Sequence, residues 1–143
     1  MSVAQDLGSV ADMCAVGAKQ TLSAMLFLGP KPQGQTPALL WEQQTTRLQG
    51  QLNSLTALNS KLTAASVVEG LKDLASELAE IGKVSKAAQA KIKKIKEVSD
   101  LLTKLAKVLD LGLALLAASA APSPATIAAV FAAGAAVADG LAT

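Results

Sequence analysis

The sequence predicts an all-α protein, and three features of its composition support that prediction. Hydrophobic residues make up 51% of the 143 residues, whereas aromatic residues make up only 2%. Alanine, which favours helices and disfavours strands, is abundant along the chain. The β-branched residues are scattered, so no segment shows the alternation of polar and apolar residues that is typical of a strand. We therefore expect a single domain of long amphipathic helices, arranged as an elongated helical hairpin or bundle.

The first expected helix covers residues 2–28. Its apolar residues recur at steps of three and four and share one face, namely Val3, Leu7, Val10, Cys14, Leu22, Met25 and Leu28. The segment 29–36 that follows contains two prolines and two glycines, which cannot continue a helix. We expect a loop there.

The second expected helix covers residues 37–64. Thr36 and Pro37 suit the N-cap and the first helical position. Apolar residues spaced seven apart form a seam that predicts packing against another helix, and they are Trp41, Leu48, Leu55 and Leu62. The polar face carries glutamines that we expect to be exposed, namely Gln43, Gln44, Gln49 and Gln51.

A third, much longer helix is expected from about residue 67 to about residue 120. Ser66 and Glu69 match a capping box, and the heptad phase breaks near residues 64–67, so we expect a turn there. A second seam continues through Leu71, Leu74, Leu78, Ile81, Ala88, Ile92 and Ile95. After Ile95 the steps shorten to three residues, which indicates a shift of the buried face rather than an end of the helix.

The C-terminal part predicts an Ala-rich helical hairpin. Residues 111–138 form a run of 28 residues without a charge, of which thirteen are Ala. Two prolines in an expected turn at residues 122–125 separate a first arm from a second helix at residues 126–139. Neither arm alone reaches the roughly 20 residues that cross a bilayer, so burial in protein and entry into a membrane both remain open. The expected contact residues are Leu113, Leu116, Ile127, Val130, Phe131 and Gly134.

A lysine cluster is the strongest electrostatic feature of the sequence. It consists of Lys83, Lys86, Lys91, Lys93, Lys94 and Lys96. Such a cluster is most typical of a solvated helix face opposite an acidic neighbour, and next of a surface that binds anionic lipid headgroups. Nucleic acid is a less favoured partner, because neither Arg nor an aromatic residue accompanies these lysines.

The residues that usually carry catalysis are missing or isolated. The chain has no His and one Cys, Cys14, whose sequence neighbours are small and apolar. The acidic row that includes Glu69, Asp73 and Glu77 is interrupted by Lys72, which is typical of a solvated helix face. We therefore expect no enzymatic activity, no cofactor, no metal and no small-molecule substrate.

The start of the sequence lacks the basic region of a secretory signal, which predicts a protein that is cytoplasmic as synthesised. Export by a leaderless route and association with a membrane stay open. The long amphipathic stalk and uncharged hairpin of residues 67–138 are similar in outline to helical pore-forming toxins and secretion-system translocators. This resemblance is one of architecture and transfers no functional residues.

Two functions are compatible with these patterns. The first is a non-enzymatic, self-associating helical protein whose C-terminal hairpin inserts into a membrane, as in a pore-forming toxin component or a translocator. The alternative is a structural or adaptor subunit of a phage-like or secretion assembly, which packs against a protein partner through its helical seams without contacting lipid. In that case Trp41 is the leading candidate for an anchor residue.

Overall fold

The computed structural model describes residues 2–141, and it confirms the all-α prediction because these residues form no strand. Its six α-helices are α1 (Val3–Leu28), α2 (Gln35–Lys61), α3 (Ala65–Gly70), α4 (Ala75–Ile92), α5 (Val98–Ala120) and α6 (Pro124–Leu141). A short 3-10 helix, η1 (Lys72–Leu74), joins α3 to α4.

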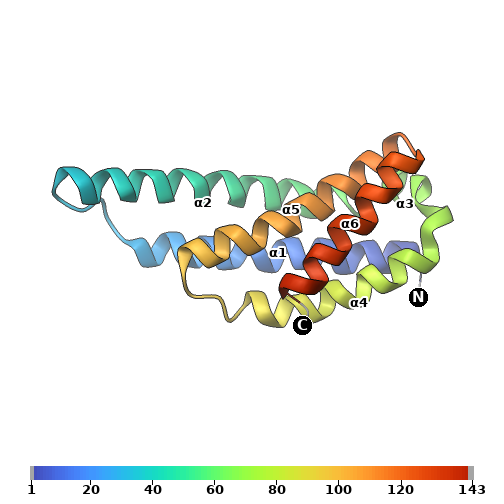
Figure 1. The fold of residues 1–143 in the computed structure, drawn as a ribbon, viewed down its shortest axis with the longest axis horizontal. Coiled ribbons are helices and arrows are strands. Elements are labelled where there is room, and N and C mark those ends of the chain that lie inside the picture. The colour runs from blue at the N-terminus through green and yellow to red at the C-terminus, as the bar shows by residue number, and fades with distance from the viewer. Residues whose placement is uncertain (1, 142–143) are drawn as a thin grey trace.

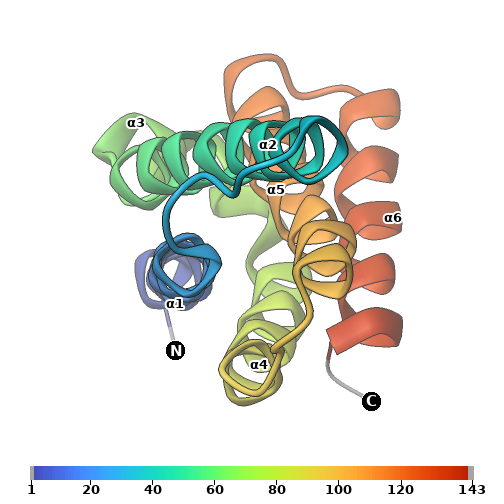
Figure 2. The same ribbon diagram turned by 90° about the vertical axis from the view of Figure 1, so that its left-hand side faces the viewer.

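The helices form an elongated bundle with one side helix (Figure 1). Helices α1 and α2 make an antiparallel hairpin, α4 packs along α1, and α5 returns between α2 and α4. Seen along the bundle, α6 lies outside this group and packs on α4 and α5 (Figure 2). The connection between α1 and α2 projects beyond the ends of α4, α5 and α6, so one end of the bundle is a free helical hairpin.

Helix α1 agrees closely with its prediction. Its N-terminus is closed by a capping box, in which the Oγ of Ser2 accepts a hydrogen bond from the backbone N–H of Gln5 and the Gln5 side chain accepts one from Ser2. The expected face is wrong at Leu22, which is 46% exposed, because Thr21 takes the buried position instead. The helix ends at Gly29, whose φ of 68° suits glycine.

Helix α2 begins at Gln35, two residues earlier than expected, and Gly34 rather than Thr36 precedes it. The predicted seam residues Leu48, Leu55 and Leu62 are fully buried. Trp41 at the head of the seam is only partly buried, and its indole N–H donates to the carbonyl of Gly29 at 3.1 Å.

One of the four glutamines expected on the exposed face of α2 is buried. Gln51 is 7% exposed, and its side-chain amide donates to the hydroxyl of Thr21 in α1 at 3.3 Å. The prediction for Gln51 is therefore wrong, because the α1–α2 contact contains a polar pair that the apolar pattern does not indicate.

The prediction of one helix from residue 67 to residue 120 is also wrong. Its span contains α3, η1, α4 and α5, and the chain reverses direction in the loop at residues 93–97. Ile95 is buried in this loop, and its carbonyl accepts a hydrogen bond of 2.7 Å from the Gln20 side chain of α1. Tertiary contacts thus end α4 where the sequence alone suggests continuation. The expected capping box at Ser66 is absent too, since α3 begins at Ala65 without a side-chain cap.

The C-terminal helical hairpin is present and consists of α5 and α6. Its turn is fixed by Ser123, whose Oγ accepts a hydrogen bond from the N–H of Thr126 at 3.1 Å, while the Thr126 hydroxyl accepts one from the N–H of Ser123 at 2.9 Å. Pro124 occupies the first position of α6, so this helix starts two residues earlier than expected. Helix α5 contributes seven buried residues, whereas α6 contributes only four although it has fewer charged residues.

Candidate functional site

The one thiol of the chain lies inside the core. Cys14 is fully buried, and burial raises the pKa of its thiol from 9.0 to about 12, so the thiol stays protonated at neutral pH. No group of three His, Cys, Asp or Glu residues that could hold a metal ion occurs within residues 2–141. The features that can make contacts are instead apolar and basic surfaces.

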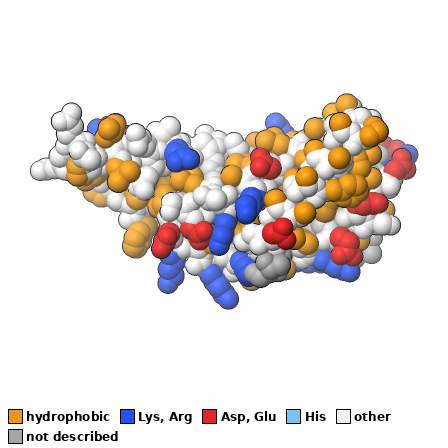
Figure 3. Space-filling model, in the orientation of Figure 1, with side chains coloured by type: hydrophobic (Ala, Val, Ile, Leu, Met, Phe, Trp, Pro, Cys, Tyr) orange, Lys and Arg blue, Asp and Glu red, His pale blue; other side chains and the backbone are white. Residues whose placement is uncertain are grey.

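Exposed apolar side chains are concentrated at the free end of the α1–α2 hairpin. We call this surface the hairpin tip, and it consists of Leu22, Leu26, Phe27, Leu39 and Leu40, which are 46%, 74%, 91%, 54% and 55% exposed. Orange side chains mark this end of the molecule in Figure 3. A large apolar side chain that is 91% exposed contributes little hydrophobic stabilisation to the fold. The hairpin tip is therefore suited to contact a partner outside the chain.

The lysine-rich segment between α4 and α5 lies next to the hairpin tip. Phe27 of the tip and Lys96 of this segment line one hollow of about 420 Å³, together with Ala24 and Ile95. Gln20 also lines this hollow, and its hydrogen bond to the carbonyl of Ile95 holds α1 against the segment. The fold therefore brings together two features that are about 70 residues apart in the sequence.

The six predicted lysines lie on α4 and in the loop that follows it. All six are exposed, but Lys83 pairs with Glu80 at 3.5 Å within α4. The four that lie at the end of α4 and in the following loop are called the basic loop, namely Lys91, Lys93, Lys94 and Lys96. Blue side chains project along this edge in Figure 3.

The charges of the helices are unevenly divided. Residues 91–107, which include the loop between α4 and α5, contain six Lys against Glu97 and Asp100. Residues 67–80, which include η1 and adjoining parts of α3 and α4, contain four Asp and Glu against Lys72. The segment beside the hairpin tip is therefore basic, although the whole chain has a net charge of only +2.

The contact residues predicted in the C-terminal hairpin are divided between two faces. Val130 and Gly134 are buried against the bundle, and Leu116 and Ile127 are partly buried. Only Leu113 and Phe131 are largely exposed, at 58% and 46%. Within the described residues, α6 alone is long and apolar enough to cross a membrane by length and composition, with a mean hydropathy of 1.5 over 18 residues.

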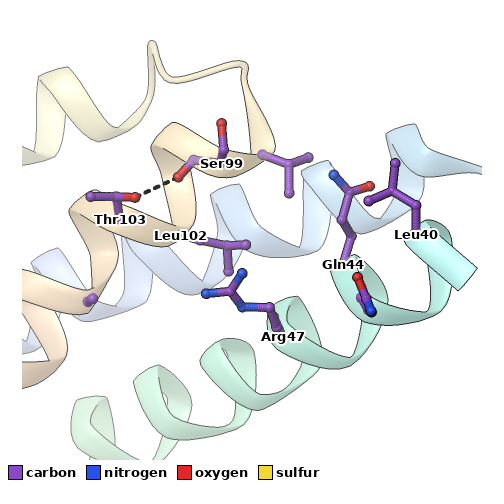
Figure 4. A pocket seen from close by; sticks show the side chains of 9 residues that line it. Leu40, Gln44, Arg47, Ser99, Leu102 and Thr103 are labelled. Carbon is purple, nitrogen blue, oxygen red and sulfur yellow. Dashed lines mark hydrogen bonds between the residues drawn. The ribbon is translucent and has the colours of Figure 1, made fainter.

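A groove between α2 and α5 opens beside the hairpin tip (Figure 4). It has a volume of about 320 Å³, and its lining includes Leu40, Gln44 and Arg47 from α2 and Ser99, Leu102 and Thr103 from α5. None of the residues that line the groove is acidic, so Arg47 gives it a positive charge.

Sequence reasoning missed the hairpin tip, although a signal for it exists. The loop at residues 29–36 is flanked by the apolar runs Leu26–Leu28 and Leu39–Trp41. Three successive residues of a helix point in directions about 100° apart, so such a run cannot face the core as a whole. Two runs on either side of a loop therefore indicate an apolar surface at the end of a helical hairpin.

Comparison with known proteins found no family model, no curated protein and no solved structure that matches this chain.

Proposed function

We propose that this chain is a non-enzymatic helical protein that binds anionic membranes through the hairpin tip and the basic loop. The observation that carries the proposal is the position of Phe27, which is 91% exposed and shares a hollow with Lys96. In this arrangement the apolar side chains enter the interfacial region of the bilayer while the lysines reach the phosphate groups.

The apolar contacts and the lysine contacts each contribute to the free energy of membrane binding. Removing a Leu or Phe side chain from water contributes about 1.5–3 kcal/mol when burial is complete. Each Lys near an anionic leaflet contributes about 1 kcal/mol, and this part weakens as salt screens the charges. Stable attachment to a membrane generally needs two such signals, and this end of the bundle supplies both.

The hairpin tip supports membrane contact better than the C-terminal hairpin does, because the tip needs no rearrangement. Insertion of α5 and α6 together would withdraw α5 from the core, where Leu101, Leu105 and Leu111 are almost completely buried. Insertion of α6 alone would expose fewer core residues, but it would still withdraw Val130, Val137 and Leu141 from the bundle, where they are almost completely buried.

Flotation with lipid vesicles tests the proposal. We expect the protein to float with vesicles that contain phosphatidylglycerol and to bind vesicles of pure phosphatidylcholine much more weakly. Raising the salt concentration from 50 mM to 500 mM should release most of the bound protein, since it shortens the screening length. Absence of binding to the anionic vesicles at low salt would refute the proposal.

A second candidate function is docking of a protein partner on the outer face of α6, as in a structural or adaptor subunit. The observation that favours it is the exposure of Phe131, a large apolar side chain on α6. The alanines around Phe131 are small, so a partner helix can approach closely. This function predicts a defined complex in light scattering whose mass and helicity do not change when lipid is added.

A further inference from the structure

The α2–α5 groove differs from the rest of the surface because it holds the one arginine of the chain. Arg47 extends from α2 toward Leu102 of α5 (Figure 4). It makes no ion pair and no hydrogen bond within the described part of the chain. Since no acidic residue lines the groove, nothing in it neutralises this guanidinium.

A further hydrogen-bond donor lies one helical turn from Arg47 on α2. The side-chain amide of Gln44 lines the groove and makes no hydrogen bond within residues 2–141, whereas the Ser99 hydroxyl points away from Arg47 (Figure 4). The hydroxyl of Thr103 already donates to the carbonyl of Ser99 at 2.9 Å. A planar guanidinium with a free amide donor one turn away on the same helix matches the oxygens of a phosphate group.

Apolar side chains line the same groove. Leu40 is 55% exposed and belongs to the hairpin tip, while Leu102 and Val98 are partly buried. An inorganic ion would leave these side chains without contacts, whereas the first carbons of an acyl chain would cover them. The volume of about 320 Å³ is at the lower end of the range for ligand sites, so it fits a headgroup and a short length of chain.

We propose that the α2–α5 groove is a subsite for the phosphate headgroup of an anionic amphiphile. Arg47 pairs with two phosphate oxygens, the Gln44 amide donates a hydrogen bond to the same group, and Leu40 and Leu102 contact the start of the tail. The inference rests on the proposed membrane function, because the groove and the hairpin tip share Leu40 and would meet the same lipid surface. The group that the groove binds is a phosphate, which either a lipid or the free ion can supply.

Calorimetric titration with a short-chain lipid below its micelle concentration tests the groove without a bilayer. Dihexanoyl phosphatidylglycerol should bind saturably, and inorganic phosphate should bind much more weakly because it lacks a tail. Arg47→Gln should lower the affinity about ten- to a hundredfold, as expected for loss of a charged hydrogen-bonding partner. Arg47→Lys should give an intermediate loss, since the charge stays but the planar fork is removed. Lys61→Gln, at the far end of α2, is the matched control and should leave the affinity unchanged.

The outcomes separate the groove from the membrane function. Equal binding by Arg47→Gln and the natural chain, or no binding of the short-chain lipid at all, would overturn the groove proposal. Equal affinity for inorganic phosphate would overturn its amphiphile part. Flotation with anionic vesicles is measured separately: floating protein without short-chain lipid binding leaves the membrane function standing and removes the groove. Binding of the short-chain lipid by a protein that does not float with vesicles would remove the membrane function and leave the groove standing.

Discussion

The carboxylate of Asp6 in α1 lies directly against the backbone of Gly82 in α4. A methyl carbon added to Gly82 would lie 2.7 Å from Oδ1 of Asp6. Asp6 is 1% exposed, and both of its carboxylate oxygens are buried without a hydrogen-bond partner among the described residues. Burial of an unpaired carboxylate is unfavourable, so Asp6→Ala should raise the free energy of unfolding, by roughly 1–3 kcal/mol.

The same contact predicts that Gly82→Ala is destabilising. The added methyl would push Asp6 or separate α1 from α4, at a cost of roughly 1–3 kcal/mol. The cost should fall sharply in the Asp6→Ala background, where the obstructing oxygen is gone. Urea unfolding of the two single variants and the double variant measures this coupling. Additive effects of the two substitutions would show that the contact does not determine the spacing of α1 and α4.

The seam of α2 provides the next prediction. Leu55 is completely buried and approaches Gly17 of α1, whose added methyl carbon would lie 3.3 Å from the Leu55 side chain. Leu55→Asp places a charge in this apolar contact and should lower the free energy of unfolding by several kcal/mol, which thermal unfolding followed by circular dichroism detects. Ser54→Asp, one residue earlier and exposed, is the control and should change it by less than about 0.5 kcal/mol. Equal melting temperatures for the two variants would contradict the seam.

Gly134 tests how closely α6 packs on the bundle. A methyl carbon on this residue would lie 3.4 Å from Ile81 of α4, which is an ordinary contact distance. Gly134→Ala should therefore be tolerated and raise the free energy of unfolding by up to about 1 kcal/mol, because alanine is the better helix former. Gly134→Leu should lower it by roughly 1–3 kcal/mol, because the larger side chain overfills the contact. A higher melting temperature for Gly134→Leu than for Gly134→Ala would show that α6 is loosely held.

The buried thiol of Cys14 predicts a dependence of stability on pH. Its pKa is about 12 in the folded chain against 9.0 for an unperturbed thiol, so the unfolded chain releases the proton first. Below about pH 9 the thiol is neutral in both states, so its ionisation does not lower the free energy of unfolding. As the pH rises from 9 toward 12, ionisation of the unfolded chain lowers the free energy of unfolding by up to about 1.4 kcal/mol per pH unit. Unfolding of Cys14→Ala, compared with the natural chain between pH 8 and pH 10.5, isolates this part from the titration of lysines. Parallel pH profiles for the two proteins would contradict the burial of an ionisable thiol.

The sequence predicts those parts of the fold that depend on local patterns. The apolar periodicity of α1, the heptad spacing of Leu48, Leu55 and Leu62, and the prolines of the α5–α6 turn each indicate the element that the structure contains. The reversal at residues 93–97 could not be predicted in this way. Its lysines are good helix formers, and the chain turns because Ile95 is buried and bonds to Gln20 of a distant helix.

The candidate site was harder to predict than the fold. The lysines of the basic loop are evident in the sequence, but their position beside Phe27 depends on that same chain reversal. The apolar runs beside the α1–α2 loop indicate that some of their residues are exposed, but no local pattern encodes how far this hairpin extends beyond the other helices. The relative lengths of the packed helices decide which apolar residues are exposed, and those lengths follow from tertiary contacts.

The most direct measurement compares two substitutions of exposed phenylalanines. Phe27 lies in the hairpin tip and Phe131 on the outer face of α6, and they are the two phenylalanines of the chain. We expect Phe27→Ser to lower the affinity for phosphatidylglycerol vesicles about tenfold or more, because one large apolar side chain no longer enters the interface. Phe131→Ser should leave that affinity unchanged, with both variants folded by circular dichroism. Loss of vesicle binding in Phe131→Ser with full binding in Phe27→Ser would contradict the account and place the membrane contact on α6.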